Sequence, residues 1–217
     1  MDLALAVRIS IAVPVAVLFG VMTVRAWRVD RKASRVMLSG YAETITDAQT
    51  VWKRRPYPAL VGSLDGYPIA VELVPDTLAL RTVPRLWVRI RWRRRHDGRL
   101  SVLVRSADEY AVEGSFTRIL AATPAWRAPV DVLGGVRAPE LMRRLESIDP
   151  TTVIALRRLL ITESELELSL VARTAHPRAY GLLRVARFGT GVLPRGLVEQ
   201  SIDLLRAIET ALGQPAT

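Results

Sequence analysis

The sequence has 217 residues but contains no cysteine and no asparagine, and only Lys32 and Lys53 are lysines. Without cysteine the chain can form no disulfide, use no thiolate nucleophile and bind no metal through sulfur. Histidine is also scarce, because His96 and His176 are the whole complement and neither has a second histidine at helical or strand spacing. We therefore predict no catalytic, cofactor-binding or metal-ligating residue.

Glycine-rich nucleotide motifs are missing as well. Gly189 and Gly191 lack a third glycine and open no nearby helix, and no P-loop sequence is present. The segment 62–66 resembles a nucleophile elbow only loosely, because Ser63 is one position away from the required spacing and a β-turn is expected there. We predict a protein that is not an enzyme and keep an uncharacterised hydrolase as an alternative.

One long apolar run stands at the start of the chain, over residues 3–24, and it contains a single charge, Arg8. A helix of this length is roughly 33 Å long, which is enough to cross the ~30 Å hydrocarbon layer of a bilayer. The alternatives are a cleaved signal peptide and a buried helix of a soluble domain. The start of the run has no basic side chain and its end has no small-residue cleavage pattern, so we predict a transmembrane helix.

Basic side chains follow this run and are opposed only by Asp30. They are Arg25, Arg28, Arg31, Lys32 and Arg35. The positive-inside rule then places the N-terminus outside and the following domain in the cytoplasm, as in a single-pass protein of a bacterial inner membrane. These five residues are candidates for contact with anionic lipids, or they only set the topology. We divide the chain into an anchor with its basic collar (1–35), a connector (36–57) and a cytoplasmic α+β domain (58–217).

Strand patterns dominate the first half of this domain. Apolar residues alternate over 59–64, 69–73, 86–95 and 100–104, and again over 163–172, with a turn at Asp65-Gly66. Helical patterns and start signals appear over about 139–147, 149–161 and 197–212, and residues 123–136 have a loop composition. The fold class is therefore α+β, with an antiparallel sheet or partly open barrel and C-terminal helices.

The strand over 86–95 has one apolar face and one arginine face. Its outward residues and those near its tip are Arg89, Arg91, Arg93, Arg94, Arg95 and Arg99. A loop at 96–98 would join this strand to 100–104 as a hairpin with a bulge. The arginine ridge suits an anionic lipid surface, a nucleic acid or an acidic protein, or it protects an edge strand. A ladder of opposite sign, Glu163, Glu165 and Glu167, has the same spacing, and we expect the two ladders to pair.

The net charge of +10 and the membrane anchor lead to one functional prediction. The layout resembles that of bacterial single-span proteins with a cytoplasmic α+β domain. We predict an accessory or scaffold subunit whose basic domain contacts a membrane protein complex or the anionic inner leaflet. A membrane-tethered nucleic-acid-binding protein is the alternative, but Trp87 is the only aromatic residue on the arginine ridge, which is too little for a stacking platform.

Overall fold

The computed structural model describes residues 36–52, 57–75, 83–104, 126–128, 130–177, 188–189 and 191–213, together with positions 17 and 21. Apart from those two positions, the predicted membrane span and the five basic residues of the collar lie outside this part of the chain. Among the described residues, no helix has both the length and the apolar character needed to cross a membrane.

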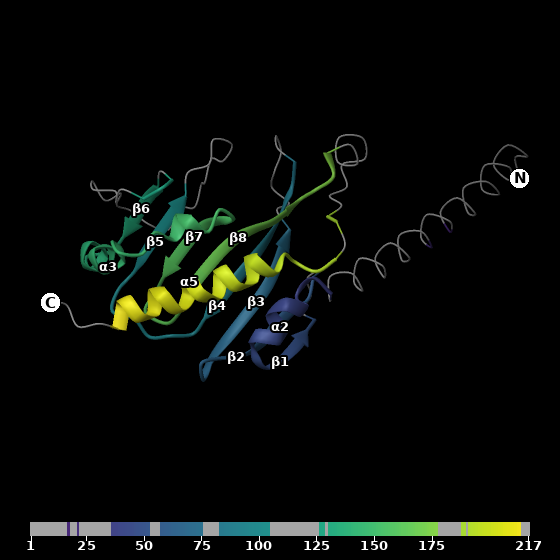
Figure 1. The fold of residues 1–217 in the computed structure, drawn as a ribbon, viewed down its shortest axis with the longest axis horizontal. Coiled ribbons are helices and arrows are strands. Elements are labelled where there is room, and N and C mark those ends of the chain that lie inside the picture. The colour runs from purple at the N-terminus through teal and green to yellow at the C-terminus, as the bar shows by residue number, and fades with distance from the viewer. Residues whose placement is uncertain are drawn as a thin grey trace, which may run out of the picture.

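The domain is built on an eight-stranded antiparallel open sheet (Figure 1). In spatial order the strands are β1 (Thr46–Val51), β2 (Ala59–Leu64), β3 (Tyr67–Pro75), β4 (Arg85–Trp92), β8 (Leu166–Thr174), β7 (Leu156–Ile161), β5 (Leu100–Val104) and β6 (Val130–Gly134). The helices are α2 (Ser39–Thr44), α3 (Ala138–Leu145) and α5 (Arg195–Gly213), with a short 3-10 turn at Pro150–Thr152. The predicted α+β class and antiparallel sheet are confirmed, and the sheet is open rather than barrel-like.

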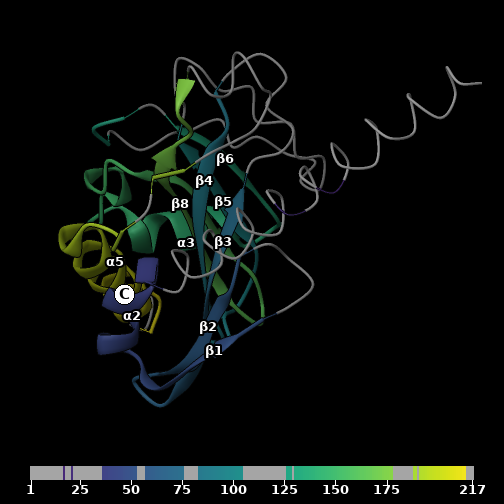
Figure 2. The same cartoon turned by 90° about the vertical axis from the view of Figure 1, so that its right-hand side faces the viewer.

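Figure 2 shows α2 and α5 on the same side of the sheet. The sheet residues facing them form apolar rows in exact register with the strand pairing, because opposite residues of antiparallel strands share a face. One such row is completely buried across five strands and consists of Val71, Ile90, Leu168, Leu159 and Val102. This row places the hydrophobic core between the sheet and the helices.

The closing helix α5 confirms the helix predicted over 197–212. Val198, Ile202, Leu205 and Ile208 recur at helical spacing and are all buried against the sheet. The hydroxyl of Tyr41 in α2 lies 3.0 Å from Ser201 Oγ, so α2 is fixed to the N-terminal half of α5. Burial raises the pKa of Tyr41 to about 12.

The hairpin predicted between 86–95 and 100–104 is wrong. The β7–β8 hairpin lies between β4 and β5, and the segment 93–99 passes its turn, where the His96 amide donates to the Glu163 carbonyl at 3.3 Å. The alternating pattern could not show this. The leucines of β8 pack against β4 with the same kind of apolar face that β5 has. Alternation alone therefore does not distinguish β8 from β5, the strand that is nearer in sequence.

The helix predicted over 149–161 is also wrong, because residues 156–161 form β7. A β-bulge at Arg157 shifts the register between Leu156 and Arg158, so Leu156, Leu159 and Ile161 all face the core. The extra residue interrupts the two-residue alternation and produces apolar spacing like that of a helix. The shorter helix predicted over 139–147 is confirmed as α3.

Two strands lie in stretches that were not expected to contain any. The connector region 36–57 contributes α2 and β1, and the predicted loop 123–136 contains β6. β1 is exposed along almost its whole length, as befits the edge of the sheet, and therefore shows no apolar alternation. The predicted strands over 59–64, 69–73 and 163–172 are confirmed as β2, β3 and β8.

Gly62→Ala should destabilise the domain. A Cβ on Gly62 would lie 2.5 Å from Ile45 Cγ2 and 2.6 Å from the Thr46 carbonyl oxygen, where β2 meets the chain entering β1. We expect a loss of about 1–3 kcal/mol from overpacking, visible as a lower thermal midpoint of the full-length protein in detergent. Gly196→Ala is the control, since nothing lies within 4 Å of its Cβ position, and its midpoint should not fall.

Candidate functional site

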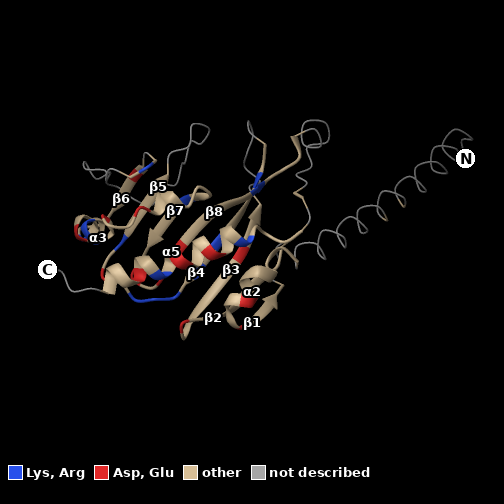
Figure 3. Ribbon diagram, in the orientation of Figure 1, with Lys and Arg blue, Asp and Glu red and all other residues tan. Residues whose placement is uncertain are grey.

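The segment 93–99, which we call the crossover, is an extended chain that passes β8 and β7 to join β4 to β5. The exposure of whole residues, backbone included, alternates along it. Arg94, His96 and Gly98 are half-buried, whereas the intervening residues are exposed: Arg93, Arg95, Asp97 and Arg99. Figure 3 shows this stretch as a basic strip beneath the C-terminal end of α5. The exposed positions are roughly 6.8 Å apart, which is the spacing of every second residue in an extended chain.

Glu209 near the end of α5 holds the crossover in place. Its Oε1 accepts a hydrogen bond from Arg94 Nε at 2.7 Å and lies 2.6 Å from Arg94 Nη2. Both side chains are about four-fifths buried, and the Arg94 guanidinium also stacks 3.6 Å from the centroid of the Tyr67 ring. An arginine bound through two of its three nitrogens and stacked on a ring has little freedom to move, so the backbone of the crossover is held at this residue.

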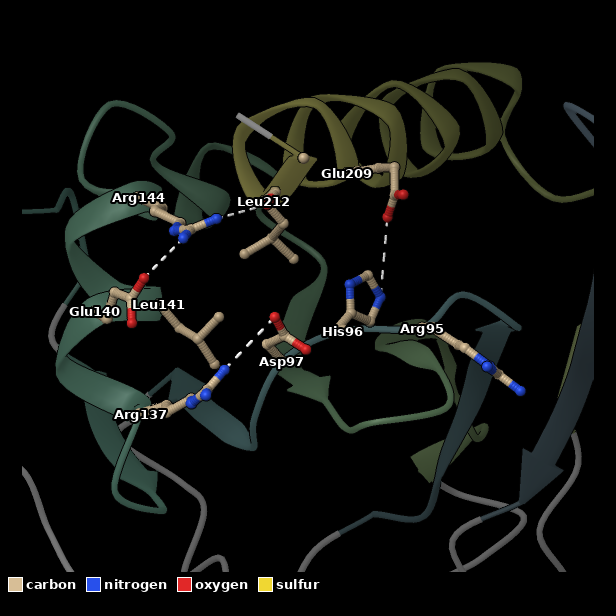
Figure 4. A pocket seen from close by; sticks show the side chains of 10 residues that line it. Arg95, His96, Asp97, Arg137, Glu140, Leu141, Arg144, Glu209 and Leu212 are labelled. Atoms are coloured by element: carbon tan, nitrogen blue, oxygen red, sulfur yellow. Dashed lines mark hydrogen bonds and ion pairs between the residues drawn. The ribbon is translucent and has the colours of Figure 1, made fainter. Parts of the chain in front are cut away.

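His96 is the second inward side chain and is 4 % exposed. Its Nε2 lies 3.8 Å from the remaining oxygen of Glu209, Oε2, and neither atom has a hydrogen-bond partner among the described residues (Figure 4). Burial lowers the pKa of His96, while the Glu209 carboxylate works in the opposite direction and Arg94 reinforces the lowering. His96 is therefore mainly neutral at physiological pH.

Two hollows flank the crossover. A cavity of about 200 Å³ lies between the crossover, α3 and the end of α5 (Figure 4). Arg144 lines it and binds Glu140 at 2.7 Å and the Leu212 carbonyl at 2.8 Å. An open groove of about 590 Å³ lies between the crossover and the turn from β6 to α3, and its rim includes Arg95, Arg99 and Arg137.

The first half of the predicted arginine ridge belongs to the sheet itself. Arg91 Nη2 lies 2.6 Å from Glu72 Oε1, and Arg89 Nε lies 3.6 Å from Glu167 Oε1. The expected pairing of the two charge ladders is thus confirmed for Arg89 and Glu167, but Arg91 pairs with Glu72 on β3. Burial nevertheless raises the pKa of Glu167, since desolvation outweighs the attraction of the nearby arginines.

Among the predicted site residues that the structure describes, the exposed positive charge therefore lies on the crossover. Arg93 and Arg95 form no ion pair with any described residue, while Arg99 makes an exposed pair with Glu163 at 3.4 Å. Sequence reasoning missed the residues that complete this surface, because Tyr67, Arg137 and Glu209 come from β3, the β6–α3 turn and α5. No local pattern connects these three positions with the crossover.

No protein-family model matches the chain, and the comparison with curated proteins finds no match. The fold resembles that of one solved structure, the crystal structure of the mycobacterial trehalose monomycolate transport factor A, TtfA. The two chains are 14 % identical, the alignment covers 82 % of this chain and 96 % of that chain, and the TM-score is 0.46. The similarity concerns the fold alone.

Glu209→Gln should loosen the crossover, because it removes the charge that binds Arg94 and leaves that guanidinium partly buried. We expect a loss of about 2 kcal/mol, measured as a lower thermal midpoint of the full-length protein. Glu199→Gln is the control on the same helix. Glu199 makes an exposed pair with Arg195 at 2.8 Å, and its loss should change stability by less than ~0.5 kcal/mol. Equal effects of the two substitutions would contradict this role for Glu209.

His96 should make stability depend on pH. Because its pKa is lower in the folded chain than in the unfolded chain, the unfolded chain binds the proton more readily below about pH 6.5. Stability should therefore fall as the pH decreases from 7 to 5, and it should fall less in His96→Gln. The raised pKa of Glu167 affects the pH dependence of stability equally in the wild type and in His96→Gln. Identical pH profiles of the thermal midpoint would contradict the assignment.

Proposed function

We propose that this chain is a non-enzymatic, membrane-anchored accessory or scaffold protein whose crossover binds an acidic surface of a membrane protein complex. The observation that carries the proposal is the alternation of inward and outward residues along the crossover. The inward side chain of Arg94 is bound to Glu209 of α5, and the outward arginines are presented to solvent at regular spacing.

A fixed row of arginines suits recognition of a protein surface. A backbone that is already held in place loses less conformational entropy on binding than a mobile loop does. The arginine guanidinium also presents a planar set of donors that matches carboxylates with two hydrogen bonds. Arg89 and Arg91 of β4 supply no such surface, because they are bound to the carboxylates of Glu167 and Glu72.

The membrane anchor completes the proposal. With a span over 3–24, the N-terminus outside and the domain in the cytoplasm, the crossover is confined near the inner leaflet. Confinement raises the effective concentration of the domain toward partners in the same membrane, so contacts that are individually weak become sufficient. A C-terminal reporter that works only in the cytoplasm should be active, and activity of an export-dependent reporter would contradict this orientation.

Co-purification tests the role of the crossover. The full-length protein, extracted from its native membrane in mild detergent, should bring down a stoichiometric membrane protein. In Arg93→Gln/Arg95→Gln the yield of that partner should fall about fivefold, since two charge contacts of roughly 0.5 kcal/mol each are lost.

The control is Arg127→Gln/Arg195→Gln, which removes the same charge at two exposed positions away from the crossover. This variant should retain the partner at the wild-type yield. Equal yields from both double variants would contradict a role for the crossover.

A further inference from the structure

We infer that the open groove between the crossover and the β6–α3 turn is the docking site for an acidic peptide segment that also carries an apolar side chain. This inference rests on the proposed function and specifies which surface and which partner chemistry are involved. The partner segment belongs to a protein of the same membrane complex.

The two walls of the groove come close together at Gly98. Gly98 has φ +129, and a Cβ there would lie 3.0 Å from Arg137 Cβ and 3.4 Å from Leu141 Cδ1, so the crossover and the start of α3 approach closely at this point. The amide of Gly135 donates to the Arg99 carbonyl at 3.1 Å and ties the two walls together. By contrast, nothing lies within 4 Å of a Cβ built on Gly135, so the groove is open above it.

The charges around the groove favour an acidic occupant. Arg95 has no ion-pair partner in the described chain, and Arg99 and Arg137 make only long, exposed pairs, with Glu163 at 3.4 Å and with Asp97 at 3.5 Å. Exposed pairs of this kind contribute little to stability, so carboxylates of an incoming chain can replace them. Arg93 lies two residues before Arg95 and adds further exposed positive charge beside the groove.

An apolar side chain stands beside these arginines. Val136 lines the groove and is 100 % exposed, although valine is more often buried. Protein interfaces combine an apolar centre with a polar rim, and Val136 among these arginines offers that combination to a partner. The occupant therefore needs both carboxylates for the arginines and an apolar side chain for Val136.

A fluorescent probe at Val136 tests this directly, because the chain has no cysteine that would compete for the label. Full-length Val136→Cys, carrying an environment-sensitive dye, is placed in nanodiscs of neutral lipid and titrated with a glutamate-rich peptide that contains one leucine. We expect a blue shift with this peptide and none when glutamine replaces glutamate. The same dye at Ile154→Cys, a position that is 86 % exposed and far from the groove, should not respond.

A blocking variant shows whether the groove itself is occupied. Gly135→Gln starts a side chain where a Cβ meets no atom within 4 Å, and it should weaken peptide binding about tenfold, with an unchanged thermal midpoint. Gly196→Gln is the matched control in the first turn of α5 and should bind as the wild type does. Wild-type binding by Gly135→Gln would overturn the inference. So would a blue shift caused by anionic nanodiscs without peptide, which would assign the surface to lipid.

Co-purification separates this inference from the proposed function. If Gly135→Gln retains the native partner as well as Gly196→Gln does, the groove is not the docking site, while the accessory function stands. If the wild-type protein brings down no stoichiometric membrane protein, the proposed function itself fails. Loss of the partner in Gly135→Gln alone supports both.

Discussion

The ion pair between Arg94 and Glu209 is the interaction on which the candidate site depends. It joins the crossover, which is the longest step across the sheet, to the helix that closes the core, and Tyr67 covers the guanidinium. Because Arg94 points inward, the residues on either side of it must point outward in an extended chain. One buried contact therefore determines which arginines face solvent.

The helix α5 connects two parts of the domain with different roles. Its N-terminal half binds α2 through Tyr41 and Ser201. Its C-terminal half binds the crossover through Glu209 and α3 through the Leu212 carbonyl. In the proposed arrangement, the first half adjoins the membrane-tethered end of the domain and the second half carries the binding surface. The hydrophobic row between helix and sheet holds the two halves in a fixed relation.

Much of the fold could be predicted from local patterns, because a half-buried strand or helix carries its period in its own residues. β2, β3, β8, α3 and α5 all follow this rule. The wrong predictions have physical causes. The bulge at Arg157 gives β7 the apolar spacing of a helix, and an edge strand such as β1 has no buried face and therefore no apolar alternation. The outward arginines of the site could be read from the sequence, but the pairing of β4 with β8 and the contribution of Glu209 come from contacts between distant segments.

We propose that the crossover, held on α5, is the surface that meets the partner complex. Amide hydrogen exchange of the full-length protein, alone and in its purified complex, tests this most directly. We expect complex formation to slow exchange over residues 93–99 and 134–137, while residues 150–156 at the other end of the sheet exchange at the same rate. Protection elsewhere, with no change over 93–99, would contradict it.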